Sequence, residues 1–328
     1  TLTEIMKLGV DLHCGAVFKE NGVQLELSEF ELKKLDNLGI PYTTSIEDLG
    51  SFYGERAVND LPKARTDLKL EQVKGKLKSG KAGPITQKTI SSTIKDNYLQ
   101  YTGSAEVDWV TPSNFNLGSM AGCLTYSEMK AELDEMRNYS VNNGLNIVSV
   151  KQDASPSGQT TWGNPSGTIT NNGLTYSGQG IASSFENEPG RDGKTFWDPE
   201  TIWYVRITGN ESGTPENTKP QMLFTSMIHS REVSALMNNI YFMWYLIENY
   251  NTDDAIKELV DNNELYFVPV VNPDGLRWNQ HLSASGGGMQ RKNCRPNTGS
   301  TSGTTSVRGV DLNRNFDYFW GAAGSGSS

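Results

Sequence analysis

The sequence predicts an α/β protein: a mixed, mostly parallel sheet with helices on both faces, preceded by a small α+β unit. Three apolar runs, TIWYVRIT, QMLFTSMI and ELYFVPVV, have the length and composition of strands. The segment SREVSALMNNIYFMWYLIENY, between the last two, has the length of a helix. A strand, a helix and a second strand predict a parallel crossover, and continuously apolar strands predict a sheet covered on both faces.

Residues 1–56 predict the small leading unit. The pair Asn21-Gly22 stands between two short apolar runs and indicates a β-hairpin. The leucines of ELKKLDNL line one face of a helix that Gly39 ends, and a second helix is expected from Ser45. This unit holds no cluster of catalytic side chains, so we interpret it as an accessory or regulatory domain.

Residues 57–114 predict a linker, because KLEQVKGKLKSGKAGP is polar and ends in a Gly-Pro break. The main domain is expected over residues 115–328. Its first helix should begin at a capping box of Thr125 and Glu128 and bury a stripe of methionine and leucine. Residues 152–198 are rich in Gly, Ser, Thr, Asn and Pro and are expected to form a surface loop.

Charge and composition exclude some classes of protein. The formal net charge is −9, which argues against a nucleic-acid partner because such proteins present a basic surface. No stretch approaches the roughly 18 apolar residues of a membrane span. Three widely spaced cysteines argue against a zinc-thiolate site and leave one disulfide open. The high content of Asn, Gly, Ser, Thr and Tyr favours a secreted, periplasmic or cell-surface protein, and the oligomeric state stays unknown.

The segment TSMIHSREVSAL places His229 and Glu232 three residues apart, directly after an apolar run. Ligands of open α/β sheets bind beyond the carboxyl ends of the strands. Imidazole nitrogen and carboxylate oxygen are both ligands of Zn²⁺. The pattern is short, so the alternative is a polar helix N-terminus in which Glu232 interacts favourably with the helix dipole.

Three later segments favour the metal site. They are VNPDG (271–275), RKNCR (291–295) and GVDLNRNFDYFWG (309–321). The ordered series H-x-x-E, N-P-D-G, R-K-N and G-V-D-x-N-R-N-[WF]-D resembles the zinc metallocarboxypeptidases of the carboxypeptidase A/B family, over residues 115–328. The leading unit resembles, more loosely, the pro-region that precedes such domains in secreted bacterial members.

The resemblance implies a zinc-dependent hydrolase. His229 and Glu232 would bind one Zn²⁺ ion. Arg291 would stabilise the oxyanion that forms when water attacks the peptide carbonyl. Asp311 would bond the other ring nitrogen of His229 and fix its tautomer.

The resemblance also implies a substrate. Asn313 and Arg314 would bind the free C-terminal carboxylate of a peptide or protein, because a guanidinium pairs with a carboxylate through two parallel hydrogen bonds. Taken alone, these two residues could instead cap a turn, and the cations near Arg291 could be a solvated charge run. We interpret the N-P-D-G segment as a plain turn, and we expect His281 at the surface.

The family pattern requires a second ligand histidine well beyond the Asn-Arg pair, a later tyrosine that closes over the substrate and a glutamate general base; after the pair this chain has no histidine and no glutamate. The resemblance therefore implies that the third zinc ligand lies beyond Ser328 and that the chain alone is inactive. The implied function of the whole protein is hydrolysis of C-terminal peptide bonds. The alternatives are a non-catalytic module that binds peptide C-termini and a related hydrolase of non-peptide amides.

Overall fold

The structure is a computed structural model that describes residues 5, 16–27, 29–78, 111–178, 196–282, 288–296 and 309–317. His13, Cys14 and the break at Gly83-Pro84 lie outside these residues. Cys123 is a free thiol, and Cys294 is buried. Among the described helices, none is both long and apolar enough to cross a bilayer.

The central sheet runs in the order β3-β6-β8-β7. Its strands are β3 (Gln152–Asp153), β6 (Trp203–Ile207), β7 (Gln221–Thr225) and β8 (Glu264–Val268). The pair β7–β8 is parallel, and the two helices α5 (Val233–Asn249) and α6 (Asp254–Asn262) connect these strands, which confirms the predicted crossover. The sheet is mixed, as predicted, but β6 pairs antiparallel with both β8 and β3, so antiparallel pairs outnumber parallel ones among the described strands.

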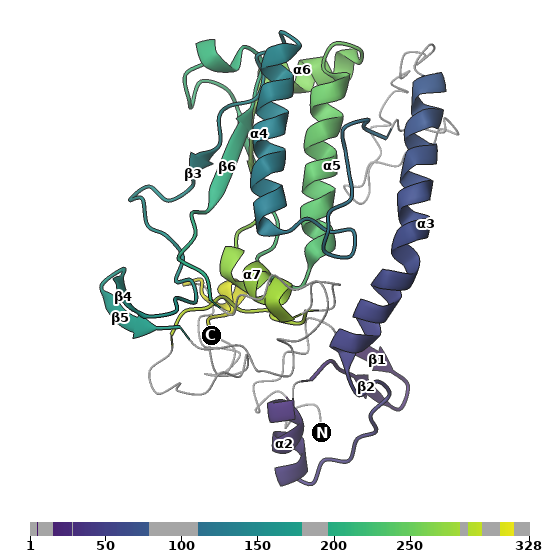
Figure 1. Cartoon of the computed structure of the whole chain (residues 1–328), viewed down its shortest axis with the longest axis vertical. Helices are drawn as coiled ribbons and strands as arrows, with labels where there is room; N and C mark the ends of the chain where they lie inside the picture. Colours follow the sequence, from purple (N-terminus) through teal and green to yellow (C-terminus); the bar gives the residue numbers. More distant parts are fainter. Residues whose placement is uncertain are drawn as a thin grey trace, which may run out of the picture.

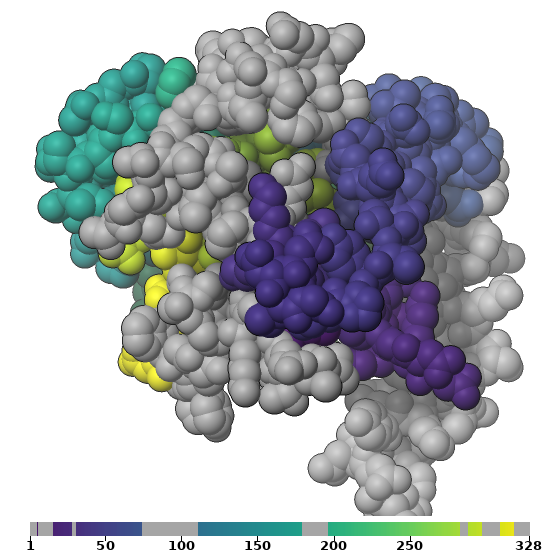
Figure 2. Space-filling view, turned by 90° about the horizontal axis from the view of Figure 1, so that it is seen from below, coloured from purple at the N-terminus to yellow at the C-terminus, as the bar shows by residue number. Residues whose placement is uncertain are grey.

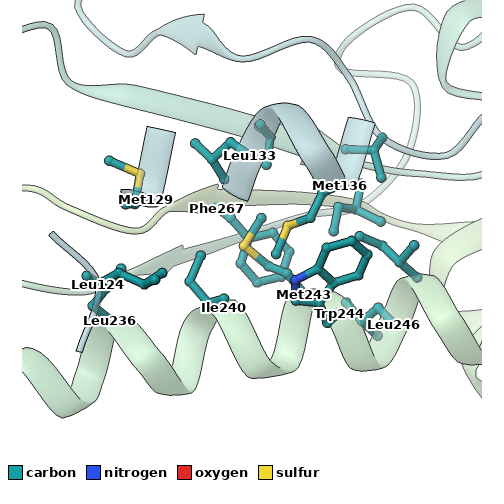
Figure 3. Packing of buried hydrophobic residues seen from close by; sticks show 14 of the residues in the cluster. Leu124, Met129, Leu133, Met136, Leu236, Ile240, Met243, Trp244, Leu246 and Phe267 are labelled. Carbon is teal, nitrogen blue, oxygen red and sulfur yellow. The ribbon is translucent and has the colours of Figure 1, made fainter. Parts of the chain in front are cut away.

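Helices α4 (Tyr126–Asn142), α5 and α6 contribute to one hydrophobic cluster with one face of the sheet (Figure 1). The cluster includes the inward-facing strand residues Val205, Ile207, Leu265 and Phe267. The stripe predicted on α4 is fully buried, and Figure 3 shows two of its members, Leu133 and Met136, gathered near Phe267 with side chains of α5. The predicted capping box is present at the start of α4.

The other face of the sheet is polar or exposed. Arg206, Tyr266 and Leu223 lie opposite one another on adjacent strands. Arg206 binds the carboxylates of Glu264 and of Glu211, in the short helix η2 (Glu211–Gly213). Leu223 is 67% exposed. Helices therefore cover only one face in the part of the chain that the structure describes, and β7, which we expected to be buried, lies at the edge of that sheet.

The leading unit contains the predicted hairpin. Strands β1 (Val17–Lys19) and β2 (Gly22–Gln24) pair antiparallel, and helix α2 (Glu29–Asn37) follows. Gly39 follows α2 in the left-handed region, at φ +63°, as expected of a residue that ends a helix.

Helix α3 (Leu49–Lys78) crosses the predicted boundary between the leading unit and the linker. The expected irregular segment over residues 57–114 is therefore helical up to Lys78. Leu68 packs against the main hydrophobic cluster, and Gln72 donates hydrogen bonds to the main-chain carbonyls of Pro112 and Phe115. These tertiary contacts stabilise a helix that the polar composition did not predict.

The region predicted as a surface loop, residues 152–198, also contains strands in its described part. Besides β3, it forms a hairpin of β4 (Thr168–Asn171) and β5 (Leu174–Ser177). The two loop residues, Asn172 and Gly173, have φ angles of +48° and +77°, which suit the tight turns of hairpins.

Candidate active site

The first predicted pair lies just past the carboxyl end of β7. Glu232 is the residue before α5, and His229 lies in the turn between β7 and that helix. The Nδ1 atom of His229 is 2.8 Å from Oε1 of Glu232. His229 is 4% exposed, whereas the Glu232 side chain is 42% exposed. The pair therefore lies just past the end of β7, with the histidine buried and the carboxylate facing solvent.

Asp311 connects three segments of the chain. Its Oδ1 atom lies 3.2 Å from Nε2 of His229 and accepts a hydrogen bond from the main-chain N–H of Asn313 at 3.0 Å. Its Oδ2 atom accepts from Nε of Arg291 at 2.9 Å. Burial alone would raise the pKa of Asp311, but hydrogen bonds from His229 and Arg291 and the charge of Arg291 outweigh it and hold the pKa at about 2. Asp311 is thus a carboxylate at ordinary pH.

The His229–Glu232 pair fits a bound cation. A neutral imidazole carries a proton on only one ring nitrogen. If Nε2 donates to Asp311, Nδ1 presents a lone pair to the Glu232 carboxylate, and two acceptors face each other at 2.8 Å. A second proton on the ring or a metal ion between the atoms removes this conflict, and a nitrogen with a carboxylate oxygen suits Zn²⁺. Within the described ranges, no group of three His, Cys, Asp or Glu side chains could hold a metal ion.

Asn313 and Arg314 lie in the short helix η3 (Leu312–Arg314), which Asp311 caps. Asn313 is exposed and Arg314 is half-buried. A guanidinium nitrogen of Arg314 donates to the main-chain oxygen of Asn313 at 3.2 Å. The bond from the Asn313 N–H to Asp311 fixes this turn beside the carboxylate that also binds His229.

The N-P-D-G segment is not a plain turn, and that interpretation was wrong. It begins helix α7 (Pro273–Leu282), and the side-chain oxygen of Asn272 accepts a hydrogen bond from the Gly275 N–H at 3.0 Å. An asparagine cap before a proline in the first helical position is a known start signal that could have predicted this helix. A Cβ atom on Gly275 would lie 2.1 Å from Oγ of Ser230, so the glycine lets α7 approach the turn that carries His229.

Two buried polar groups of α7 were also missed. Asp274 is 1% exposed. It accepts hydrogen bonds from the Thr161 hydroxyl and from the main-chain N–H groups of Trp162 and Gly163. Burial raises the pKa of Asp274 above its ordinary value. His281, expected at the surface, is 4% exposed and stacks on Trp197 with 5.0 Å between ring centres. Local sequence did not indicate that a distant segment covers α7.

Comparison with known proteins identifies relatives of this region. The zinc carboxypeptidase family, Peptidase_M14, matches residues 192–328. A metallocarboxypeptidase A of Arthroderma otae is 36% identical over 113 residues, which cover 34% of this chain and 25% of that protein. A zinc carboxypeptidase of Saccharothrix mutabilis subsp. capreolus is 30% identical over 173 residues, which cover 52% of this chain and 35% of that protein.

A carboxypeptidase A1 of Sus scrofa is 31% identical over 139 residues, covering 40% of this chain and 31% of that protein. The chain thus spans between about a quarter and a third of the length of these curated relatives. All of the residues that form the candidate site fall within the matched segment. Residues 192–328 are thus similar to the zinc carboxypeptidase family.

Proposed function

We propose that the protein of which this chain forms part is a zinc-dependent enzyme that hydrolyses the C-terminal peptide bond of peptides or proteins. The observation that supports this most directly is the bridging carboxylate of Asp311, which contacts both His229 and Arg291. It holds a candidate metal ligand and a candidate oxyanion-stabilising cation at one place. The match of residues 192–328 to the zinc carboxypeptidase family supports the same chemistry.

His229 and Glu232 would hold the zinc ion, together with a third protein ligand outside the described residues. A bound zinc ion supplies a Lewis acid that polarises a carbonyl group. With the proton on Nε2 of His229, Asp311 would accept it and so direct the Nδ1 lone pair toward Glu232, where the ion would bind.

The cationic groups would act on the substrate. The Arg291 guanidinium, held by Asp311, would stabilise the negative charge that develops on the scissile carbonyl oxygen. Asn313 and Arg314 would bind the C-terminal carboxylate, which restricts cleavage to the last residue of a chain.

The experiment uses the intact protein with zinc and a peptide offered with a free or an amidated C-terminus. We expect single amino acids to be released from the free peptide only, and release to stop when the metal is chelated. Arg291→Ala should lower kcat by roughly 10²–10³-fold, whereas Arg314→Ala should mainly raise KM. Equal cleavage of both peptides would contradict the carboxylate-binding role of Asn313 and Arg314.

The described residues offer two metal ligands and not three, which also suits a non-catalytic module that binds peptide C-termini. Such a module would bind the free peptide more tightly than the amidated one and release no amino acid. For the same reason, we expect the 328-residue chain by itself to release nothing from a zinc-supplied peptide. Turnover by this chain would refute that expectation.

We also infer that residues 1–56 act as a pro-region-like unit that restricts access to the site of the main domain, residues 115–328. Nη1 of Arg231, between the two proposed ligands, lies 3.4 Å from Oε2 of Glu26. In Figure 2 the purple atoms of the leading unit face the same side of the molecule as the yellow atoms of the last described segments. Limited proteolysis that removes this unit should raise activity, and unchanged activity would argue against the inference. A secreted, periplasmic or cell-surface location fits such a processed precursor.

A further inference from the structure

A buried asparagine on α7 joins the two loops that carry the candidate site. Asn279 is 2% exposed. Its Nδ2 atom donates to the main-chain oxygens of Ser230 at 2.9 Å and Gln290 at 3.0 Å, and its Oδ1 atom accepts from the Gln290 N–H at 2.7 Å. Ser230 follows His229 in the chain, and Gln290 precedes Arg291. One side chain therefore binds the main chain next to both proposed functional residues.

Further hydrogen bonds connect the same loops. The Ser230 hydroxyl donates to the main-chain oxygen of Gln290 at 2.6 Å, and the Ser230 N–H donates to the main-chain oxygen of Arg291 at 3.3 Å. We call Ser230, Asn279 and Gln290 the α7 junction. Because α7 is anchored by the buried side chains of Leu276 and Trp278, the junction ties both loops to a rigid element (Figure 1).

The chemistry of the junction requires an amide of this length. The Ser230 main-chain oxygen accepts from this side chain, the Gln290 oxygen accepts from it as well as from the Ser230 hydroxyl, and the Gln290 N–H needs an acceptor. An asparagine side chain supplies both the donors and the acceptor, whereas an ionised aspartate supplies no donor and an alanine neither. The site is also tight: a Cβ atom on Gly288 would lie 2.7 Å from Cβ of Asn279, so the glycine lets the main chain approach this side chain closely.

We propose that Asn279 is a positioning residue that fixes Arg291 relative to the His229–Glu232 pair. The bond between Arg291 and Asp311 orients the end of a long, flexible side chain, but the main chain that bears it must also be held. The α7 junction holds it at the position next to Arg291. The catalytic consequence rests on the proposed function, whereas the positioning is a property of this chain and is testable without turnover.

The first test measures amide hydrogen exchange in the 328-residue chain. Asn279→Ala and Asn279→Asp remove the donors that hold the loops, so exchange at Gln290 and Ser230 should accelerate at least about tenfold more than at the amides of β6 and β8. The control is Val260→Ala, which removes a buried side chain near the start of β8, at the end of the sheet away from the junction. It should accelerate exchange at Gln290 no more than at core amides. Uniform acceleration in the Asn279 variants would overturn the proposal.

The second test measures steady-state kinetics of the intact, zinc-loaded protein on a peptide with a free C-terminus. A misplaced functional group lowers the rate of the chemical step, so Asn279→Ala should lower kcat by roughly 10–100-fold with little change in KM. Val260→Ala should keep the wild-type kcat. Faster local exchange with an unchanged kcat would overturn the positioning role. A wild-type protein without turnover would instead refute the proposed function, and the exchange result would still decide whether Asn279 holds the loops.

Discussion

Replacing Asp311 with asparagine tests whether one carboxylate holds the candidate site together. The Asp311 side chain is 6% exposed and binds His229, Arg291 and the main chain of Asn313. Asparagine has the same size but a single acceptor oxygen, so its NH₂ group must face one of the donors that the carboxylate satisfied. The variant loses at least one charge-assisted hydrogen bond and the negative charge beside Arg291.

A hydrogen bond to a charged group contributes about 1.5–3 kcal/mol, so the free energy of unfolding should fall by about 2 kcal/mol at neutral pH. The pKa of Asp311 in the folded protein is about 2, below its ordinary value of 3.8. A lowered carboxyl pKa stabilises the folded state above the unfolded pKa, and this stabilisation is lost as the pH falls through the folded pKa. The difference between wild type and variant should therefore shrink as the pH falls from about 4 to about 2.

Urea unfolding followed by tryptophan fluorescence measures this difference at each pH. Asp317→Asn is the matched control, because Asp317 is an exposed carboxylate shortly after the same turn, and its stability should stay within about 0.5 kcal/mol of wild type. Equal stability of Asp311→Asn and wild type at neutral pH would refute the reasoning. So would a difference that does not shrink in acid.

Three other substitutions test the core and the buried charges, all by urea unfolding. Glu264→Gln should lower the free energy of unfolding by about 3 kcal/mol at neutral pH. Burial opposes the ionisation of Glu264, but hydrogen bonds from Tyr266 and from three successive main-chain N–H groups hold its pKa at about 2. The loss of stability should therefore diminish in acid. Glu132→Gln should stabilise by about 1 kcal/mol at neutral pH, because burial raises the Glu132 pKa to about 6, and this gain should vanish below the ordinary carboxyl pKa. Leu133→Ala, at a fully buried position, should cost about 2–5 kcal/mol, and an unchanged stability would contradict the packing of α4.

Elements with a strong local signal were predicted correctly. The crossover from β7 through α5 to β8 follows from apolar runs of strand and helix length, and the start of α4 follows from its capping box. These signals are local because the period of the side chains and the capping bonds involve residues within a few positions of one another.

Elements that depend on distant contacts were predicted poorly. Helix α3 continues through a polar stretch because Leu68 and Gln72 bind the main domain. The start of α7 was interpreted as a turn, although Asn272 before a proline was a usable signal. The burial of His281 depends on Trp197, which belongs to another part of the chain.

The sequence by itself determined which chemical groups are present and in what order: a histidine and a glutamate after an apolar strand, and a later series of cations and amides typical of zinc carboxypeptidases. Only the tertiary structure decided that Asp311 contacts His229 across 82 positions, that Asn279 binds both loops, and that β7 leaves Leu223 exposed. The physical reason is that hydrogen bonds and burial between distant residues depend on the path of the whole chain, which no local pattern of side chains encodes.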